Sequence, residues 1–294
     1  MTRPRNPLTD RILVPLDGSD LSEAILPLVG RDGHAWGAEV LLVRTLGPES
    51  SVGPTAESEA LAYLAARART LERRGLRVRW EVWHGDPSQT IVNAAVRGGV
   101  SLIAMTTHGR RGWDRLRFGS VAESVVGKAP VPVLLVRGQV RWPADRPPRI
   151  LVPLDGSELS AAIVPVVAGL GRPLHAVIEL LHVLEGMPLA GYPHLAVSFT
   201  GESSGGGAAR DYLELAAAPL VAEGLKIECV VLEGSAVTVI TRRAADTGAD
   251  LIAMSTHGRS GVARLLLGSV AQQVLRTVDV PILLWKAPVA TAVP

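Results

Sequence analysis

Short, uniformly apolar runs alternate along the chain with amphipathic segments of helical periodicity. Runs such as ILVPL and VLLV lack the polar residue at every second position that a half-exposed strand would have, which is typical of a parallel sheet covered by helices on both faces. The predicted strands are Ile12–Leu16, Val40–Thr45, Arg77–Trp83, Ser101–Thr106 and Val131–Val136, then Ile150–Leu154, Ile178–Val183, Lys226–Leu232, Leu251–Ser255 and Pro281–Trp285. Helices are expected between them, in the first half over Ser19–Ala35, Glu57–Arg74, Ser88–Arg97 and Ser120–Lys128. The pattern predicts an α/β protein with two doubly wound, Rossmann-like domains, each built on a five-stranded parallel sheet.

The two halves of the chain are copies of one module. RILVPLDGSDLSEAILP, from Arg11, returns as RILVPLDGSELSAAIVP from Arg149, an offset of 138 residues. The stretch that begins THGRRGWDRLRFGS at Thr107 returns as THGRSGVARLLLGS at Thr256, an offset of 149 residues. Loops have little packing to satisfy, so their retention in both copies indicates a functional site in each.

The difference between the two offsets places an insertion of 11 residues in the second copy, within Glu185–Gly207. Its GESSGGG piece is expected to be a mobile loop. A proline- and arginine-rich stretch, RGQVRWPADRPPR, separates the copies and predicts a linker. Domains are therefore expected over residues 1–137 and 149–294, with the linker at 138–148.

The last predicted strand of each copy, VPVLLV and VPILLW, is very apolar. An exposed edge of that kind invites pairing with another strand, and proteins usually cover it. The two strands are expected to pair with each other across a pseudo-twofold axis, which would make the chain an intramolecular pseudo-dimer. Association of two chains into a homodimer stays open.

Composition excludes several classes of function. The 30 basic and 28 acidic residues leave a net charge of +2, too balanced to indicate nucleic-acid binding. No apolar run approaches the ~18 residues that span a bilayer, and MTRPRNPLTD lacks the apolar core of a signal peptide, so no membrane contact and a cytoplasmic location are expected. The single cysteine, Cys229, lies in IECVVL and is expected to be a buried strand residue.

Two loops in each copy carry the candidate chemistry. Asp17 and Asp155 directly follow the first strand of each copy, and Gly109–Ser120 and Gly258–Ser269 follow the fourth strand and lead into a helix. In a doubly wound sheet the carboxyl ends of strands one and four flank the switch point where ligands bind. Each copy is therefore predicted to bring a carboxylate and a glycine-bounded loop to one crevice.

The two loops suit a nucleotide. An aspartate can accept hydrogen bonds from a ribose hydroxyl or an adenine N–H. A Gly-Ser pair opens the following helix (Gly119-Ser120 and Gly268-Ser269), whose first amides and positive dipole end suit phosphate. Ser is also a common helix cap and Asp-Gly-Ser a common turn, so either element alone favours a structural role. Their convergence in both copies favours a ligand site.

The residues around the loop glycines do not by themselves distinguish a ligand site from a structural role. Arg110, Arg111, Arg115 and Arg117 form a basic cluster that suits an anionic ligand as well as a solvated surface. His108 and His257 precede the loop glycines, and we expect them to shape the loops as donors, because no cysteine or placed serine pairs with them as it would with a base. Met105 and Met254 fit core packing or contact with a base edge. A GxSxG match at Gly201–Gly205 lies in the insertion and is treated as chance.

Over almost the whole of both copies, these residues resemble the universal stress protein family in its tandem-domain form. The family's nucleotide motif is G-x-x-G, nine residues, then G-[ST]. Its second half is intact here, from Gly109 to Gly119-Ser120 and from Gly258 to Gly268-Ser269, whereas Thr106 and Ser255 replace the first glycine.

The resemblance implies ATP binding, with Mg²⁺ accompanying the nucleotide, and it implies site residues in each copy. In the first copy they are Pro15, Asp17, Thr45, Thr106, Thr107, His108, Gly109, Arg110, Arg111, Gly112, Gly119, Ser120 and Val121. In the second they are Pro153, Asp155, Val183, Ser255, Thr256, His257, Gly258, Arg259, Ser260, Gly261, Gly268, Ser269 and Val270. The second copy is closer to the family pattern, with His182-Val183 in place of Arg44-Thr45 and Ala249-Asp250 in place of Val100-Ser101. If only one site binds nucleotide, the second is expected to be that site.

The implied function is that of an ATP-binding regulator in the stress response, which holds nucleotide and acts through an unidentified protein partner rather than as an enzyme. No Walker lysine or cluster of metal-binding carboxylates supports fast hydrolysis. A slow ATPase or adenylyl-transferring enzyme stays open. So does a dimeric interaction module that binds no nucleotide, which the missing first glycines favour.

Overall fold

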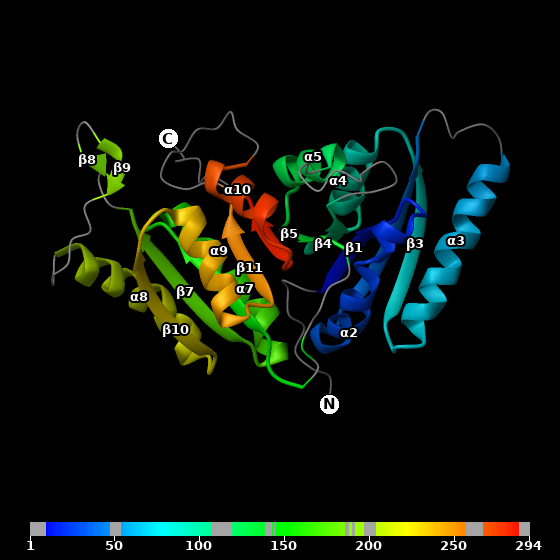
Figure 1. Cartoon of the computed structure of the whole chain (residues 1–294). Helices are drawn as coiled ribbons and strands as arrows, with labels where there is room; N and C mark the ends of the chain where they lie inside the picture. Colours follow the sequence, from blue (N-terminus) through cyan, green and yellow to red (C-terminus); the bar gives the residue numbers. More distant parts are fainter. Residues whose placement is uncertain are drawn as a thin grey trace, which may run out of the picture. The chain divides into compact units, whose positions relative to one another are not determined.

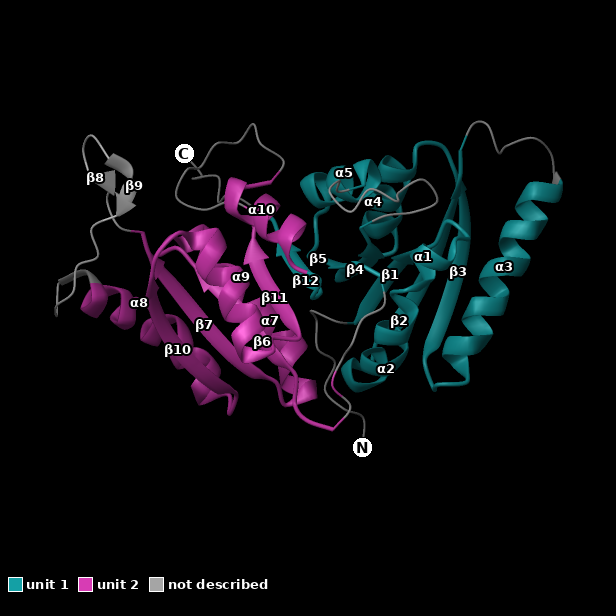
Figure 2. Ribbon diagram, viewed as in Figure 1, with its two compact units in different colours: residues 1–142, 279–286 teal, residues 143–278, 287–294 magenta. Residues whose placement is uncertain are grey.

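The computed structural model describes residues 10–47, 54–107, 119–138, 143, 145–185, 188–189, 192–196, 204–256 and 267–287. The chain divides into two compact units, coloured separately in Figure 2: residues 1–142 with 279–286, and residues 143–278 with 287–294. Unit 1 thus includes a short segment from the end of the second repeat.

Unit 1 is built on strands in the order β12-β5-β4-β1-β2-β3, labelled in Figure 2 and seen from the same side in Figure 1, which is coloured along the sequence. Their bounds are β1 Arg11–Pro15, β2 Glu39–Leu46, β3 Arg77–His84, β4 Leu102–Thr106, β5 Val133–Val136 and β12 Ile282–Trp285. The helices are α1 Asp20–Glu23, α2 Leu26–Trp36, α3 Pro54–Glu72, α4 Pro87–Arg97 and α5 Ser120–Lys128. Strands β1 to β5 pair in parallel, and α3 packs along β3. The predicted doubly wound α/β arrangement of the first repeat is confirmed.

The last strands of the two repeats pair with each other inside unit 1. β12 runs antiparallel to β5, with Leu283 opposite Leu134 and Ile282 opposite Leu135. Every residue of β5 is buried, as are the first three of β12. The expected pairing of the two apolar terminal strands is therefore confirmed.

Unit 2 has the strand order β10-β7-β6-β11, with parallel pairing of β10 with β7, β7 with β6, and β6 with β11. The strands are β6 Arg149–Leu154, β7 Val177–Leu184, β10 Lys226–Glu233 and β11 Leu251–Ser255. The helices are α6 Glu158–Ala161, α7 Val164–Gly171, the 3₁₀ helix η1 Arg172–Leu174, α8 Ser204–Ala222, α9 Ala236–Thr247 and α10 Ser269–Thr277. α8 packs along β10, as α3 does along β3.

Burial follows the position of each strand in its sheet. On the central strand β1, Ile12, Leu13 and Val14 are completely buried. The edge strands β3 and β10 are exposed or half-exposed along their whole length. Cys229 on β10 is half-buried, so the expectation of a buried cysteine was wrong, because an edge strand has a neighbour on one side only.

The structure corrects the single helix expected over Ser19–Ala35. It breaks into α1 and α2 around Ala24 and Ile25. Pro27 has no N–H to donate to the carbonyl of Glu23, four residues earlier, and its ring crowds that carbonyl, so α1 ends at Glu23 and α2 begins with Pro27 in its first turn.

The described residues of the insertion in the second repeat contain secondary structure that its composition did not indicate. It contains a two-stranded antiparallel hairpin of β8 Pro188–Leu189 and β9 Tyr192–Ala196. Ser204–Gly207, expected to belong to a mobile loop, forms the first turn of α8 instead. The packing of α8 against β10 and β7 outweighs the poor helix propensity of its three glycines. No helix in the described part of the chain is long and apolar enough to cross a membrane.

Candidate functional site

The loop after β1 holds the carboxylate of Asp17 in a tight turn. Its Oδ1 accepts hydrogen bonds from the Ser19 amide at 2.9 Å and the Ser19 hydroxyl at 2.6 Å. Gly18, between them, has φ of +84°, a backbone conformation that other residues rarely adopt. Ser19 also caps α1 by accepting from the Ser22 amide at 3.2 Å. The turn therefore fixes where the carboxylate lies at the end of the strand.

The second repeat builds the same turn with the same dimensions. The Oδ1 of Asp155 accepts from the Ser157 amide at 2.9 Å and its hydroxyl at 2.6 Å, and Gly156 has φ of +90°. Ser157 caps α6 by accepting from the Ser160 amide at 3.1 Å. Asp17 and Asp155 are thus both positioned and both half-buried.

The ends of β4 and β11 are joined by one hydrogen bond each to the glycine that starts the next helix. The Gly119 amide donates to the Thr107 carbonyl at 3.0 Å, and the Gly268 amide donates to the Thr256 carbonyl at 2.6 Å. A Cβ on Gly268 would lie 2.7 Å from that carbonyl oxygen, closer than real Cβ contacts. A glycine is therefore required at this position of the second repeat.

Helices α5 and α10 begin without a side-chain cap. Gly119 and Gly268 are the N-cap residues and have no side chain to accept from the first-turn amides. α4, by contrast, is capped by Asp86, whose Oδ1 accepts from the Gln89 amide at 2.9 Å. Helix amides in the first turn have no acceptor within the helix, so α5 and α10 present N–H groups that suit an anion.

In each repeat the end of strand four lies against the short helix that follows the aspartate loop. In unit 2 the Ser255 hydroxyl donates to the Ser160 carbonyl at 3.4 Å, which links the end of β11 to α6. In unit 1 the corresponding elements, β4 and α1, are also in contact. The described ends of the loops after strands one and four thus lie close together in both repeats.

The end of strand two lies beside the same loop. The Leu16 amide donates to the Val43 carbonyl at 2.8 Å, and Pro15 stands opposite Val43. Pro153 stands opposite Leu181 in the second repeat. Thr45 and Val183, both half-buried, come two residues further along their strands.

Several predicted site residues fall outside the residues that the structure describes. In the first repeat they are His108, Gly109, Arg110, Arg111, Gly112, Arg115 and Arg117, and in the second His257, Gly258, Arg259, Ser260 and Gly261. The described parts of both loops are the buried threonines that precede them, Thr106, Thr107 and Thr256, with half-buried Ser255, and the Gly-Ser-Val steps that follow them.

Comparison with known proteins gives the same assignment over both repeats. The model of the universal stress protein family matches residues 9–137 and again residues 148–286. The chain belongs to the universal stress protein family.

Individual relatives agree. The chain is 30% identical over 144 residues to a universal stress protein of Methanocaldococcus jannaschii, covering 48% of this chain and 82% of that protein. It is 24% identical over 250 residues to one of Synechocystis, covering 85% of this chain and 79% of the other. The crystal structure of a universal stress protein from Archaeoglobus fulgidus superposes with a TM-score of 0.71 at 21% identity, over 95% of this chain and 98% of that one.

Within this universal stress protein fold, a tyrosine contacts the segment that follows the aspartate in each repeat, and sequence reasoning missed both tyrosines. Tyr63 donates to Glu23 of α1 at 2.8 Å, and the guanidinium carbons of Arg44 and Arg67 lie 5.0 and 5.3 Å from its ring centre. Arg67 also donates to Glu23 at 2.8 Å. Burial, aided by Glu23, raises the pKa of Tyr63 to about 12. The cluster therefore ties α3 to α1, the helix that follows the Asp17 loop.

The second repeat replaces this cluster of arginines and glutamate with contacts to serine and histidine. The Tyr212 hydroxyl lies 3.4 Å from the Ser157 carbonyl and from the Ser160 hydroxyl. The buried ring of His182 meets the Tyr212 ring edge-on at 6.1 Å. Tyr63 and Tyr212 are separated by the same 149 residues as the repeated loops, which is the sequence feature that could have identified them.

Asp250 does not belong to the site, although it was one of the differences that made the second copy look closer to the family. It precedes β11, at the opposite end of the strand from Ser255. Its carboxylate accepts two hydrogen bonds from the linker residue Arg146, at 2.7 and 3.0 Å, and one from the Arg149 amide at 2.8 Å. Asp250 therefore anchors the linker to unit 2.

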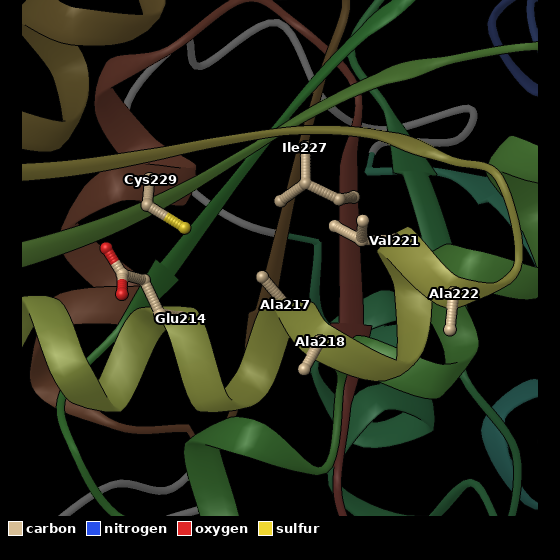
Figure 3. A pocket seen from close by; sticks show the side chains of 7 residues that line it. All are labelled: Glu214, Ala217, Ala218, Val221, Ala222, Ile227 and Cys229. Atoms are coloured by element: carbon tan, nitrogen blue, oxygen red, sulfur yellow. The ribbon is translucent and has the colours of Figure 1, made fainter.

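A shallow hollow lies elsewhere, between α8 and β10 (Figure 3). Ile227 and Cys229 face it from the first half of β10, and Glu214 and Ala217 face it from α8. Burial raises the pKa of the Cys229 thiol, so the thiolate is disfavoured. This apolar hollow is remote from the carboxyl ends of the strands and is not part of the candidate site.

Proposed function

We propose that each repeat binds an adenine nucleotide, ATP, at the carboxyl end of its sheet, and that the chain acts as a nucleotide-dependent regulator. The observation that carries the proposal is the pairing, in both repeats, of an oriented aspartate with a helix that starts on an uncapped glycine. An acceptor for a ribose hydroxyl or base N–H and a group of donors for phosphate are the two parts that a nucleotide site needs.

The residues present suit both the nucleoside and the phosphates of the nucleotide. The carboxylate of Asp155 is held in place by Ser157, so it loses little freedom when it accepts from the nucleoside. The amides at the start of α10 and the exposed hydroxyl of Ser269 supply phosphate donors. Mg²⁺ would arrive with the polyphosphate, which supplies most of its oxygen ligands. No group of three or more His, Cys, Asp or Glu side chains among the described residues is arranged to hold a metal ion.

A regulatory role follows from the chemistry that these residues offer. They bind and orient, since each carboxylate is held in place by its turn and the phosphate donors are backbone amides and a serine hydroxyl. We infer that the protein holds ATP without rapid turnover, in the cytoplasm, and signals its bound state to a protein partner during stress. Membership of the universal stress protein family supports this role.

Calorimetric titration of ATP into the full chain tests the proposal. The Asp17→Ala/Asp155→Ala double variant is expected to lose ~1–3 kcal/mol of binding free energy at each site, because a donor of the nucleotide loses its acceptor. A matched control, Ser19→Ala/Ser157→Ala, disturbs the same turn but keeps the carboxylates, and it is expected to bind more tightly than the double aspartate variant. Unchanged ATP affinity in a folded Asp17→Ala/Asp155→Ala chain would remove the proposed site.

Two further measurements separate the other functions. Mass spectrometry of ligand carried through purification distinguishes a nucleotide-binding protein from an interaction module that binds none. Steady ATP consumption by the purified chain, abolished in the double aspartate variant, would instead identify a slow ATPase at the same site.

A further inference from the structure

Strand β3 lies at the outer edge of the sheet formed by the described strands. Among the described strands it pairs with β2 alone. The Gly85 amide, just beyond β3, donates to the Leu46 carbonyl at 3.0 Å. Successive residues of a strand direct their amide and carbonyl groups to opposite sides. The backbone groups of the odd-numbered residues therefore point toward β2, as that of Gly85 does, and those of Val78, Trp80 and Val82 point away from it.

The side chains along this edge are unusually exposed for their type. Trp80, in the middle of β3, is 39% exposed, and the side chain of Arg79 is 70% exposed although its guanidinium lies 3.8 Å from Glu39. An edge strand with an exposed aromatic residue at its centre is a template for pairing with another strand.

The sequence of β3, RVRWEVWH, is complementary to itself when reversed about Trp80. In that antiparallel register Arg79 faces Glu81 of the other strand, Glu81 faces Arg79, and Val78 faces Val82. We propose that two copies of this chain associate edge to edge through β3, in antiparallel register centred on Trp80. The interface is isologous, so every favourable pair occurs twice.

The backbone and the charges select this register. The outward amide and carbonyl groups of one strand can bond those of the other only when the twofold axis of the strand pair passes through a residue and not between two residues. An axis through Trp80 meets this condition. Centring one residue earlier places Arg79 opposite Arg79, and centring one residue later places Glu81 opposite Glu81. Like charges directly opposite each other destabilise a strand pair, whereas opposite charges stabilise it.

The edge strand of the second repeat, β10, offers a comparison within the same chain. Cys229 holds the position of Trp80, and a reversal about it places Glu228 opposite Val230 and Lys226 opposite Leu232. Glu228 is already paired with the charged Arg149 at 2.6 Å, whereas Glu81 accepts from the neutral indole N–H of Trp83 on its own strand at 2.9 Å. The complementarity is thus a property of β3, and it points to a second copy of β3 as the occupant.

Sedimentation velocity of the full chain without nucleotide, between about 1 and 500 μM, tests the proposal, since an interface of one strand per chain is small and its dimer concentration-dependent. The wild type is expected to dimerise. Arg79→Glu and Glu81→Arg each create two like-charge pairs and are expected to raise the dimer Kd about tenfold or more. The Arg79→Glu/Glu81→Arg double variant restores complementarity and is expected to return close to the wild-type Kd. A monomeric wild type, or a dimer that neither single variant weakens, overturns the proposal.

Crosslinking locates the contact independently of the charges. Trp80→Cys in a Cys229→Ser background places the only two thiols of a dimer opposite each other, at a Cα separation of about 5.5 Å that a disulfide can span. Oxidation is expected to link this chain covalently. Leu61→Cys in the same background, 41% exposed on α3, is the control and is expected to stay unlinked. No link at position 80, or equal linking at both positions, contradicts the β3 interface, and neither result bears on nucleotide binding.

Discussion

Glu179 on β7 occupies the place that Leu41 occupies on β2. Glu179 stands opposite Leu151 in unit 2, and Leu41 stands opposite Leu13 in unit 1. Glu179 is completely buried and accepts from Arg243 at 2.7 Å and from Arg149 at 3.2 Å. The second repeat therefore keeps a carboxylate where the first packs a leucine, and two arginines compensate it.

Removing that carboxylate alone is expected to destabilise unit 2. Glu179→Leu leaves the Arg243 guanidinium without its buried partner, which typically costs about 3–5 kcal/mol. Glu179→Leu/Arg243→Ala recreates the arrangement of Leu41 and Ala94 and is expected to recover most of the loss, because Arg149 keeps Glu228 at 2.6 Å. Urea unfolding of the three chains measures both effects. A single variant as stable as the wild type would show that the buried pair contributes nothing.

The stability of unit 1 is expected to fall between about pH 4 and pH 6 because of Asp32. Burial raises the pKa of this α2 carboxyl from 3.8 to about 6, against the opposing effect of Arg31 at 2.8 Å, and its buried Oδ2 has no hydrogen-bond partner. Because the folded pKa lies above the unfolded one, the protonated form favours folding at low pH. That contribution is lost as pH rises through the folded pKa, at a cost of roughly 2–3 kcal/mol.

Leu170 holds the position of Asp32 in the second repeat and supplies the matched substitution. Asp32→Leu is expected to stabilise the chain at pH 7.5 by up to roughly 2–3 kcal/mol, with the gain shrinking toward pH 4. Urea unfolding at several pH values measures the difference. A gain that does not depend on pH would mean that packing, and not ionisation of Asp32, is responsible.

Two glycine-to-alanine changes are expected to act in opposite directions. Gly268→Ala places its Cβ 2.7 Å from the Thr256 carbonyl oxygen, so the start of α10 must shift, and both stability and ATP affinity should fall. Gly207→Ala adds a Cβ with nothing within 4 Å, near the start of α8, and is expected to stabilise by about 0.5–1 kcal/mol. Thermal unfolding with and without ATP tests both. A Gly268→Ala chain with wild-type stability and affinity would contradict the requirement for glycine.

The parts of the fold that depend on burial were predictable from sequence. Apolar runs such as that of β5 are buried because the sheet leaves them no exposed face, and the pairing of β5 with β12 followed from their shared apolarity. The break between α1 and α2 could have been placed from Pro27. The helical start of α8 could not, since a run of glycines favours a loop and the helix is stabilised by packing of its other residues against β7 and β10.

The turns and helix caps of the candidate site could be predicted from sequence, whereas the side chains that pack around them could not. The Asp-Gly-Ser turns and glycine caps are local, so repetition of their sequence was sufficient to find them. Tyr63 and Tyr212 lie on distant helices and reach the site only through the tertiary fold. Asp250 was misleading because neighbours in sequence can lie at opposite ends of a strand, and the partner that explains it, Arg146, is 104 residues away.

The two sites are expected to differ in how strongly salt weakens them, and this prediction rests on the proposed function. Arg44, directly before Thr45, lies over the Tyr63 ring at 5.0 Å, whereas the second repeat has His182 against Tyr212. A permanent cation beside the first site attracts a polyphosphate through a field that salt screens, since the Debye length falls from about 10 Å at 0.1 M to about 3 Å at 1 M. The second site lacks that cation.

We therefore expect the second site to hold ATP more tightly at high salt, with the difference narrowing as salt falls. ATP titrations of the Asp17→Ala chain, which reports the second site, and of the Asp155→Ala chain, which reports the first, measure each affinity at about 0.05 and 0.5 M salt. Arg44→His in the Asp155→Ala chain copies His182 into the first repeat and is expected to reduce its salt dependence. Equal affinities at both salt concentrations, or a first site that dominates at high salt, would show that Arg44 and His182 do not set the difference.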